Sequence, residues 1–491
     1  MIDKLREVTG LEIYEQSVHE TDTATYFMAR RGGEKFIGCV GDGGIKGDKT
    51  GDVDGKPVIV GATSHENAEA IRDRLPFAGP MCVGLHTSLG FGDRLGLATP
   101  GHIRAVRGTH ISPVLAQQSI REMKRTRRTP EEVMDAATWG VMQEGYRDTF
   151  GSDADHLQQP LDIDRTAEAG FTMFTIDPGE HVDDEADDRD PAALAGKLEG
   201  LDTEPLEATA DDLRKLYVDR TFPLEGGGEV SFDEETFLRA AAKYAGAVAH
   251  TVRMYRHLRE KRDEGEFELE VSVDETETPT SPEEHYFIAA ELKRLGVQWV
   301  SLAPRFVGRF EKGVDYIGDL DEFRRSFARH AAVMRTVGPY KISIHSGSDK
   351  FSIYPIVAEL TEGLVHVKTA GTSYLAALKA IAETDPGLFR EIIEFARKRY
   401  ETDKATYHVS ADISRVPATG DLPDDALGEL TDHFDARQML HVTFGSVLTE
   451  DDGGLFGSRI SDALRGDEET HYEAVRSHLR RHVEPFLYAD E

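Results

Sequence analysis

Histidines and acidic residues that follow short apolar segments are the residues of this 491-residue chain best suited to do chemistry. His345 ends the alternating segment YKISIH, and His366 stands in the similar segment GLVHVK. A third histidine, His156, follows Asp155 in the segment DADHL. Imidazole nitrogens together with one carboxylate can hold a catalytic divalent cation that keeps an open coordination position. We therefore expect His156, His345 and His366 to bind a metal and Asp155 to move protons.

The expectation of a metal site rests on the recurrence of these histidines in similar segments, and not on any single histidine. A single histidine in such a segment is more often a buried structural group than a ligand. Only Cys39 and Cys82 are present, which is too few for an all-thiolate zinc site. A metal site in this chain must therefore use His and carboxylate ligands, and zinc, nickel, manganese and cobalt all accept such donors.

Short polar loops follow both histidine segments. The loop SGSDK contains Ser346, Asp349 and Lys350, and its glycine lets backbone N–H groups approach an anionic or polyhydroxylated ligand. Lys368 shares a strand face with His366, because it lies two residues further along. We expect Ser346, Asp349, Lys350 and Lys368 to contact the substrate.

An acidic cluster follows the apolar segment FELEVSV, with Asp274, Glu275 and Glu277 in succession. Carboxylates at the end of a strand can bind metal or move protons, whereas a solvated acidic turn is the alternative for a chain this acidic. The continuation TPT favours a specified loop.

The elements that must position these residues are repeated strand and helix units. From about residue 81, short apolar segments ending in polar residues alternate with helical patterns, which predicts parallel strands. The predicted strands lie at 81–88, 113–119, 171–177, 267–275, 297–305, 340–350, 363–373, 406–412 and 439–446, and the predicted helices at 129–145, 282–295, 320–337 and 373–382. His408 and His441 fall in the last two strand patterns, and we expect structural or supporting roles for them.

We predict an α/β fold with a (β/α)8 TIM-like barrel. Residues suited to catalysis follow many of the predicted strands, as in a barrel, whereas an open sheet would gather them at one crevice. Residues 81–491 would form this catalytic barrel. Residues 1–80, with strand patterns at 35–40 and 57–60 and a Gly/Asp-rich turn between them, would form a small N-terminal α/β appendage. The acidic stretch at about 182–228 interrupts the pattern, and we interpret it as a surface insertion.

Composition excludes several classes of protein. The 90 acidic residues against 57 basic ones give a formal charge of −33, which disfavours binding to nucleic acid or an anionic membrane.

No window is long and apolar enough for a membrane span or a signal peptide, so we expect a cytoplasmic, water-soluble protein. Only 18 of the basic residues are Lys, and an acidic, Lys-poor surface suits high salt, so we also expect a halophilic protein. The pattern leaves the oligomeric state open, a homo-oligomer included.

The sequence lacks the common nucleotide-binding and serine hydrolase motifs. The sequence holds neither G-x-G-x-x-G nor G-x-x-x-x-G-K-[ST], and no G-x-S-x-G nucleophile elbow. Dinucleotide chemistry and serine hydrolysis are therefore disfavoured.

Several longer motifs resemble the tagaturonate epimerase family, from about residue 86 to the C-terminus. The segments are GFGDRLGLATPGH from Gly90, ADHL from Ala154, FTIDPGEH from Phe174, SVDETETPT from Ser272, SLAPRFVGRFEKGVDYIGDL from Ser301, HSGSDKFSIYP from His345, HVKTAGTSYL from His366 and LHVTFGSVL from Leu440. The acidic insertion after His181 departs from the family pattern. The resemblance implies a barrel-like, metal-dependent epimerase that interconverts tagaturonate and fructuronate, small keto-sugar acids.

The chemistry of such substrates assigns further roles. The inverted carbon lies β to the ketone, so simple deprotonation cannot invert it, and retro-aldol cleavage followed by re-addition, or transient oxidation of the alcohol, is required. The missing dinucleotide motif favours the retro-aldol route. That route needs two proton-transfer groups, for which Asp155 and Glu275 are the candidates. A uronate carboxylate also needs cations, for which Arg94, Lys350 and Lys368 are the candidates, and structural ion pairs are the alternative for each.

Two other functions remain compatible with these residues. A ketohexose 4-epimerase acting on tagatose and fructose, or a related metal-dependent sugar aldolase, would use the same site without the uronate preference. A sugar-acid binding protein would keep the barrel without turnover, but binding alone would not need two proton-transfer carboxylates beside a metal.

Overall fold

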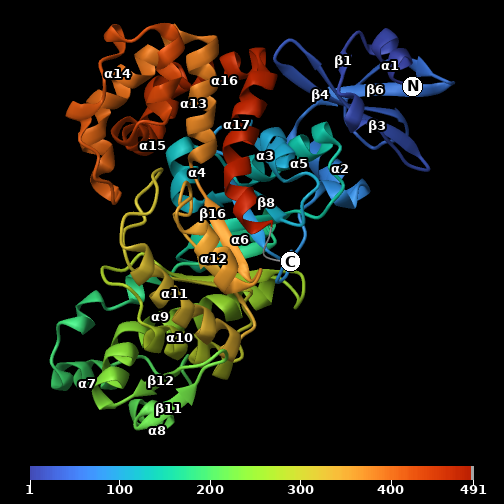
Figure 1. Ribbon diagram of the computed structural model, residues 1–491. Helices are drawn as coiled ribbons and strands as arrows, with labels where there is room; N and C mark the ends of the chain where they lie inside the picture. Colours follow the sequence, from blue (N-terminus) through green and yellow to red (C-terminus); the bar gives the residue numbers. More distant parts are fainter. Residues whose placement is uncertain (488–491) are drawn as a thin grey trace.

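A closed barrel of eight parallel strands forms the centre of the computed structural model, which describes residues 1–487 (Figure 1). In order around the barrel the strands are β7 (Ser88–Gly92), β8 (Ser112–Ser119), β9 (Gly151–Leu157), β10 (Met173–Ile176), β13 (Glu268–Val273), β14 (Ser301–Pro304), β15 (Lys341–Ile344) and β16 (Val365–Thr369). Each strand pairs in parallel with its neighbour, and β16 pairs with β7 to close the ring. The predicted (β/α)8 barrel is confirmed.

Helices connect successive strands on the outside of the barrel. They are α3 (Thr99–Val106), α4 (Ile120–Thr126), α5 (Pro130–Glu144), α6 (Pro160–Glu168), α9 (Glu234–Lys261), α10 (Pro282–Arg294), α11 (Leu320–Val337) and α12 (Tyr354–Thr361). Capping boxes fix where two of them begin, with Thr129 and Glu132 at α5 and Ser281 and Glu284 at α10. The helices predicted at 129–145, 282–295 and 320–337 are confirmed as α5, α10 and α11, and the one predicted at 373–382 is confirmed as α13 (Thr372–Thr384), after the last barrel strand.

The barrel interior is unusually polar. Barrels of this type are mostly filled by branched apolar side chains, whereas Lys368 on β16 reaches carboxylates on β9 and β13, and Lys341 on β15 reaches Ser88 on β7. The buried polar side chains of the barrel strands include Ser88, Gln117, Asp153, Asp155, Thr175, Glu270, Ser272, Ser301, Lys341, Ser343, His366 and Lys368. A polar residue at every second position of an otherwise apolar segment therefore marks the inward face of these strands.

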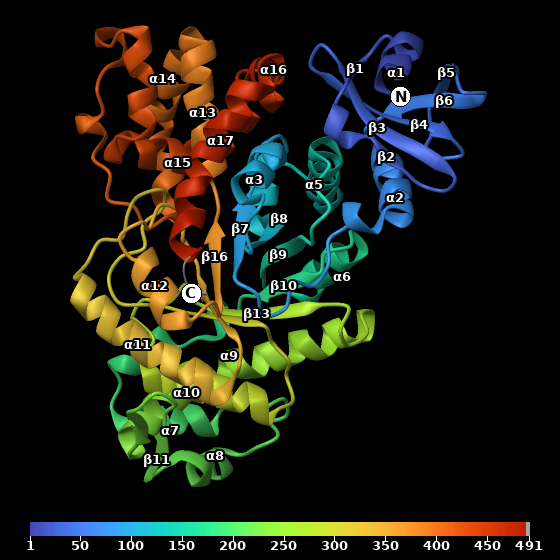
Figure 2. The same cartoon turned by 45° about the vertical axis from the view of Figure 1, so that its right-hand side comes forward.

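An antiparallel sheet precedes the barrel, and Figure 2 shows it beside α5. Its strands are β1 (Glu12–Ile13), β2 (His19–Glu20), β3 (Ala24–Arg31), β4 (Glu34–Gly41), β5 (Asp48–Val53) and β6 (Lys56–Ala62), with α1 (Ile2–Thr9) and α2 (His65–Arg74) against them. The strands predicted at 35–40 and 57–60 correspond to β4 and β6. A small apolar core containing Tyr26, Ile37 and Ile71 joins this sheet to Trp139 of α5.

Small elements occupy the stretch between β10 and α9, and Figure 1 places most of them at one end of the molecule. They are α7 (Pro191–Glu199), α8 (Ala210–Tyr217) and the two-stranded sheet of β11 (Arg220–Pro223) and β12 (Glu229–Phe232). The acidic stretch at 182–228 thus contains two short helices and a strand.

Within the described residues five α-helices follow the last barrel strand, and they correct part of the strand prediction. They are α13 (Thr372–Thr384), α14 (Pro386–Asp403), α15 (Phe434–Thr449), α16 (Gly457–Gly466) and α17 (Glu468–Val483). The strands predicted at 406–412 and 439–446 are wrong, because the first is an irregular loop and the second lies within α15. The strand predicted at 81–88 is also misplaced, since β7 begins at Ser88. Apolar residues of α13 to α16 pack into a second core of their own, which explains the apolar pattern that was taken for strands. Among the described helices none is both long and apolar enough to cross a membrane.

Candidate active site

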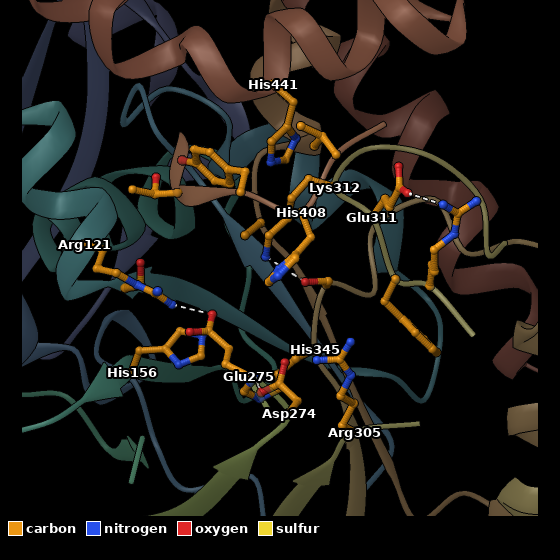
Figure 3. A pocket seen from close by; sticks show the side chains of 18 of the residues that line it. Arg121, His156, Asp274, Glu275, Arg305, Glu311, Lys312, His345, His408 and His441 are labelled. Carbon is orange, nitrogen blue, oxygen red and sulfur yellow. Dashed lines mark hydrogen bonds and ion pairs between the residues drawn. The ribbon is translucent and has the colours of Figure 1, made fainter. Parts of the chain in front are cut away.

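A cavity of about 520 Å³ lies at the carboxyl ends of the barrel strands, where active sites of this fold are built (Figure 3). Asp155 and His156 at the end of β9, Asp274 and Glu275 after β13, Arg305 after β14, and His345 and Ser346 after β15 line it. The loop at 406–410 and His441 of α15 line the same cavity, so the C-terminal helices contribute to the site.

The backbone at His156 explains how two neighbouring residues face one cavity. Successive side chains of a regular strand point to opposite faces, but His156 has a positive φ of 56°. The pairing register between β9 and β10 also shifts at this point. Asp155 and His156 therefore both line the cavity.

Asp155, His156 and His345 form the candidate metal-binding group of this cavity. One possible ligand atom from each lies within 4.8 Å of the others. Acidic neighbours surround both rings. His345 Nδ1 lies 3.0 Å from Asp274 and its Nε2 lies 2.6 Å from Glu270, and His156 Nδ1 lies 3.5 Å from Asp177. The donor set of two imidazoles and one carboxylate fits a catalytic divalent cation.

The protonation of these groups reflects the excess of carboxylates. Burial opposes the charged form of both imidazoles, but Asp155 acting on His156 and Asp274 acting on His345 raise their pKa values to about 9 and about 10. Burial also opposes the ionisation of Asp155, but His156 and Lys368 hold its pKa below the ordinary value. The site therefore attracts positive charge, which a divalent cation would supply in place of two protons.

His366 lies deeper in the barrel and does not join this group. Its Nδ1 lies 2.9 Å from Ser88 Oγ, and its Nε2 has no hydrogen-bond partner among the described residues. Burial lowers its pKa to about 3. The structure thus brings His156 and His345 together but places His366 about one layer of side chains below them.

Lys368 is buried between three carboxylates. Its Nζ lies 2.7 Å from Asp153, from Asp155 and from Glu270, and it donates to Thr175 Oγ1 at 2.6 Å. Burial opposes its charge, but the carboxylates raise its pKa well above the ordinary value. This ammonium group has no donor left for a substrate carboxylate, and it holds Asp155 in place instead.

Glu275 is the most accessible carboxylate of the candidate group. Its side chain is 37% exposed, and its Oε1 lies 2.5 Å from Arg121 Nη2 and 3.8 Å from His156 Nε2. Figure 3 shows its carboxylate between Arg121 and His156, facing the open part of the cavity. His156 also lies 3.5 Å from Asp177, which orients the ring from behind.

The loop after β15 splits into a part that lines the cavity and a part that does not. Ser346 lines it and accepts a hydrogen bond from Lys312 at 2.7 Å. Lys350 is fully buried, and its Nζ donates to the backbone carbonyls of Glu311, Val314 and Ser348. Burial lowers the pKa of Lys350 to about 7. Lys350 thus holds the loop of Glu311 and Lys312 against the barrel.

Asp349 belongs to a second cluster, with His478 and His482 of α17, whose possible ligand atoms also lie within 4.8 Å of one another. Arg437 Nη2 pairs with Asp349 at 2.7 Å, and the Asp349 backbone N–H donates to His482 Nε2 at 2.9 Å. Because an arginine and a backbone donor already occupy these groups, the cluster fits a metal less well than the cavity does. It joins α15 and α17 to the loop that carries His345.

Arg94 lines the cavity but is committed to a structural pair. It is buried, donates to Glu122 Oε1 at 2.9 and 2.7 Å, and stacks on Phe444. Of the three cations expected to hold a substrate carboxylate, none therefore has a free donor facing the cavity.

Several residues of the site were not identified from the sequence. Asp153 and Glu270 stand at alternate positions of apolar segments, a pattern that marks an inward face. Arg305 and Lys312 belong to the segment PRFVGRFEKG, whose dense charge within an apolar context is a signal for a loop that carries function. His408 and His441 line the cavity, although strand patterns suggested only supporting roles for them.

Comparison with known proteins agrees with this architecture. The family model described as tagaturonate epimerase, UxaE, matches residues 14–486. The tagaturonate/fructuronate epimerase of Thermotoga maritima is 43% identical over 482 residues, which is 97% of each chain. Crystal structures of the fructuronate-tagaturonate epimerase UxaE from Cohnella laeviribosi, native and complexed with glycerol, are 37% identical, superpose with a TM-score of 0.90 and cover 99% of this chain and 98% of that one. The chain belongs to the tagaturonate epimerase family and is an isomerase.

Proposed function

We propose that this enzyme interconverts tagaturonate and fructuronate with the help of a divalent cation. The observation that carries the proposal is the convergence of Asp155, His156 and His345 at the carboxyl ends of the barrel strands, with Glu275 beside them. The similarity to tagaturonate/fructuronate epimerases over nearly the whole chain supports the same substrates.

The reaction is best described as a retro-aldol cleavage followed by aldol re-addition. With the ketone numbered C2, inversion takes place at C4, and cleavage of the C3–C4 bond converts the C4 hydroxyl into an aldehyde. The electrons of that bond pass to the three-carbon ketone fragment as an enediolate. Rotation of the aldehyde and re-formation of the bond invert C4, so no oxidant is consumed.

His156 and His345 would hold the cation, and one oxygen of Asp155 lies close enough to take part. When bound, the cation supplies a Lewis acid that polarises the ketone. Asp274 and Glu270 contact the two nitrogens of His345. The cation would take the place of one of these contacts, and the other would orient the ring. Lys368 fixes Asp155 through its Oδ1.

Glu275 and Asp155 are the proposed proton-transfer groups. Glu275 Oε1 and Asp155 Oδ2 lie 3.8 and 3.9 Å from His156 Nε2, so both reach the region beside the proposed metal. One would take the proton from the C4 hydroxyl, and the other would return it after the aldehyde has rotated. An Asp155→Asn variant that keeps its metal but loses turnover would assign proton transfer to Asp155, and loss of the metal would assign it a ligand role.

The test is to follow tagaturonate by NMR with the metal-loaded enzyme, with and without EDTA, and tagatose in parallel. Formation of fructuronate that stops with EDTA and returns with a divalent cation is the expected result. Turnover of tagatose alone would favour the ketohexose 4-epimerase, and EDTA-resistant turnover would contradict the metal.

A further inference from the structure

The cations that line the cavity differ in what they already bind. Arg94 is paired with Glu122, Arg121 with Glu275 and Arg309 with Glu311. Arg125 donates to Thr406 Oγ1 at 2.8 Å and also to Tyr407, on whose ring it stacks. Each of these guanidinium groups is committed to a protein partner.

Arg305 is the exception. It is half-buried, follows β14 directly and lines the cavity. Its backbone is held on both sides, because its N–H donates to Thr280 Oγ1 and its carbonyl accepts from the Thr280 N–H. Its side chain has no hydrogen bond or ion pair with any residue from 1 to 487. Figure 3 shows the Arg305 guanidinium reaching up into the cavity from the barrel side, near Asp274.

A guanidinium without a partner among the described residues, in a cavity of a chain with a formal charge of −33, is a binding group for an anion from outside the protein. A planar guanidinium matches a carboxylate with two parallel hydrogen bonds. Lys312 lines the same cavity, and the one partner of its Nζ within residues 1–487 is the neutral Ser346 Oγ, at 2.7 Å. Arg305 and Lys312 are thus lining cations that no carboxylate of the described residues neutralises, in a cavity that carboxylates such as Asp274 and Glu275 also line.

We propose that Arg305, assisted by Lys312, binds the carboxylate of the sugar acid and determines the preference for a uronate over a neutral ketose. This inference rests on the proposed function for the identity of the acid. It replaces Arg94, Lys350 and Lys368 in that role, because their donors are already used within the protein.

The carboxylate contact has a consequence for the retro-aldol route. Cleavage between C3 and C4 leaves the carboxylate on the aldehyde fragment, which is tartronate semialdehyde, while the other fragment becomes dihydroxyacetone once its enediolate is protonated. After cleavage no covalent bond holds the aldehyde fragment. The contact with Arg305 therefore retains this fragment while it rotates.

The experiment compares the full-length enzyme with its Arg305→Gln and Arg305→Lys variants. Arg324→Gln, which removes an arginine paired with Glu359 on the surface of α11, serves as the matched control for loss of one positive charge. Because the Arg305 side chain has no protein partner among the described residues, its replacement leaves no buried group unpaired. Two readouts are used: steady-state kinetics with tagaturonate, and ligand-observed NMR binding of glycerate and of glycerol as probes with and without a carboxylate.

We expect Arg305→Gln to lower kcat/KM for tagaturonate about 10- to 100-fold, as loss of a charged hydrogen-bonded pair does. Glycerate affinity should fall by a similar factor while glycerol affinity stays unchanged. Arg305→Lys should recover part of the loss, and NMR should detect dihydroxyacetone released by the Gln variant.

Equal binding of glycerate by the wild type and the Gln variant, or an equal loss of glycerate and glycerol affinity, would overturn the inference even if the wild type turns over tagaturonate. Conversely, a wild type that binds glycerate through Arg305 but does not turn over tagaturonate would refute the proposed function and leave the carboxylate site standing. The two failures are thus distinguishable.

Discussion

Replacing Lys368 by Met would remove the cation that three buried carboxylates share. Asp153, Asp155 and Glu270 each lie 2.7 Å from its Nζ, and all four side chains are nearly inaccessible to solvent. Burial, together with repulsion from Asp155 and Glu270, raises the pKa of Asp153 to about 6 even though Lys368 lowers it. Without the ammonium group, three carboxylates would face each other in a barrel with little water.

The cost of this change follows from the geometry. Breaking a buried ion pair by removing one partner destabilises a protein by about 3–5 kcal/mol, because the other charge is left uncompensated. The carboxylates can relieve part of the cost by taking up protons, which would disturb Asp155 in the site. We therefore expect a loss of about 3–5 kcal/mol in the free energy of unfolding and a loss of activity that is the same for uronate and neutral ketose.

Urea unfolding of the metal-free protein measures the first quantity, and kinetics with tagaturonate and tagatose measure the second. Lys341→Met is the matched control, because Lys341 is also buried in the barrel but its Nζ donates only to Ser88 Oγ among the described residues. Burial lowers the pKa of Lys341 to about 8, so its charge is poorly compensated and its removal should cost no more than about 1 kcal/mol. A further variant, Lys368→Met with Glu270→Gln, should recover part of the lost stability.

Two results would refute this reasoning. If Lys368→Met unfolded at the same urea concentration as Lys341→Met, the shared ion pairs would contribute little. If it lost activity on tagaturonate but not on tagatose, Lys368 would bind the substrate carboxylate, as its position near His366 in the sequence first suggested.

Three further predictions test other parts of the structure. Glu275→Gln should lower kcat by about 10²- to 10⁴-fold, the usual contribution of a proton-transfer group, without lowering the metal content, and unchanged kcat would exclude that role. The folded protein keeps several buried histidines neutral, whereas the unfolded chain protonates them near pH 6.5. Unfolding therefore takes up protons below that pH, so stability should fall as the pH drops from about 6.5 to about 4, and a thermal unfolding midpoint that stays constant over this range would contradict it. The histidines with the clearest lowered pKa are His102 and His471 at about 4 and His330, His366 and His482 at about 3, each mainly because of burial. Finally, the acidic, Lys-poor composition predicts activity in molar KCl, and inactivation by that salt would exclude adaptation to it.

The sequence contained enough information for the barrel and for two of the three residues of the proposed metal group, His156 and His345. Apolar segments that end in polar residues located β8, β10, β13, β14, β15 and β16, because a strand buried on both faces leaves a continuous apolar signal. The same signal failed at 439–446, because a helix buried on all sides in the second core gives an apolar segment too. Local pattern does not distinguish these two cases.

The division of roles among the cations could not be predicted for a different reason. Lys350 and Lys368 stand beside cavity residues in the sequence, but most partners of their amino groups are distant along the chain, such as Val314 for Lys350 and Asp153 for Lys368. Whether a cation is free depends on such long-range contacts, which spacing does not encode. Arg305 is free for the same reason, since no acidic side chain among residues 1–487 forms an ion pair with it.

The positive φ of His156 restricts how this position can change over evolution or in the laboratory. Left-handed backbone is tolerated by Gly, Asn, Asp and His but strains bulky and β-branched residues. An Asn here would keep the shape of the strand end while shortening the side chain, whereas Val would disturb both. One residue therefore provides both the imidazole and the left-handed backbone conformation, so selection acts on both at once. A homologue with a β-branched residue at this position must have a different backbone at the end of its third barrel strand.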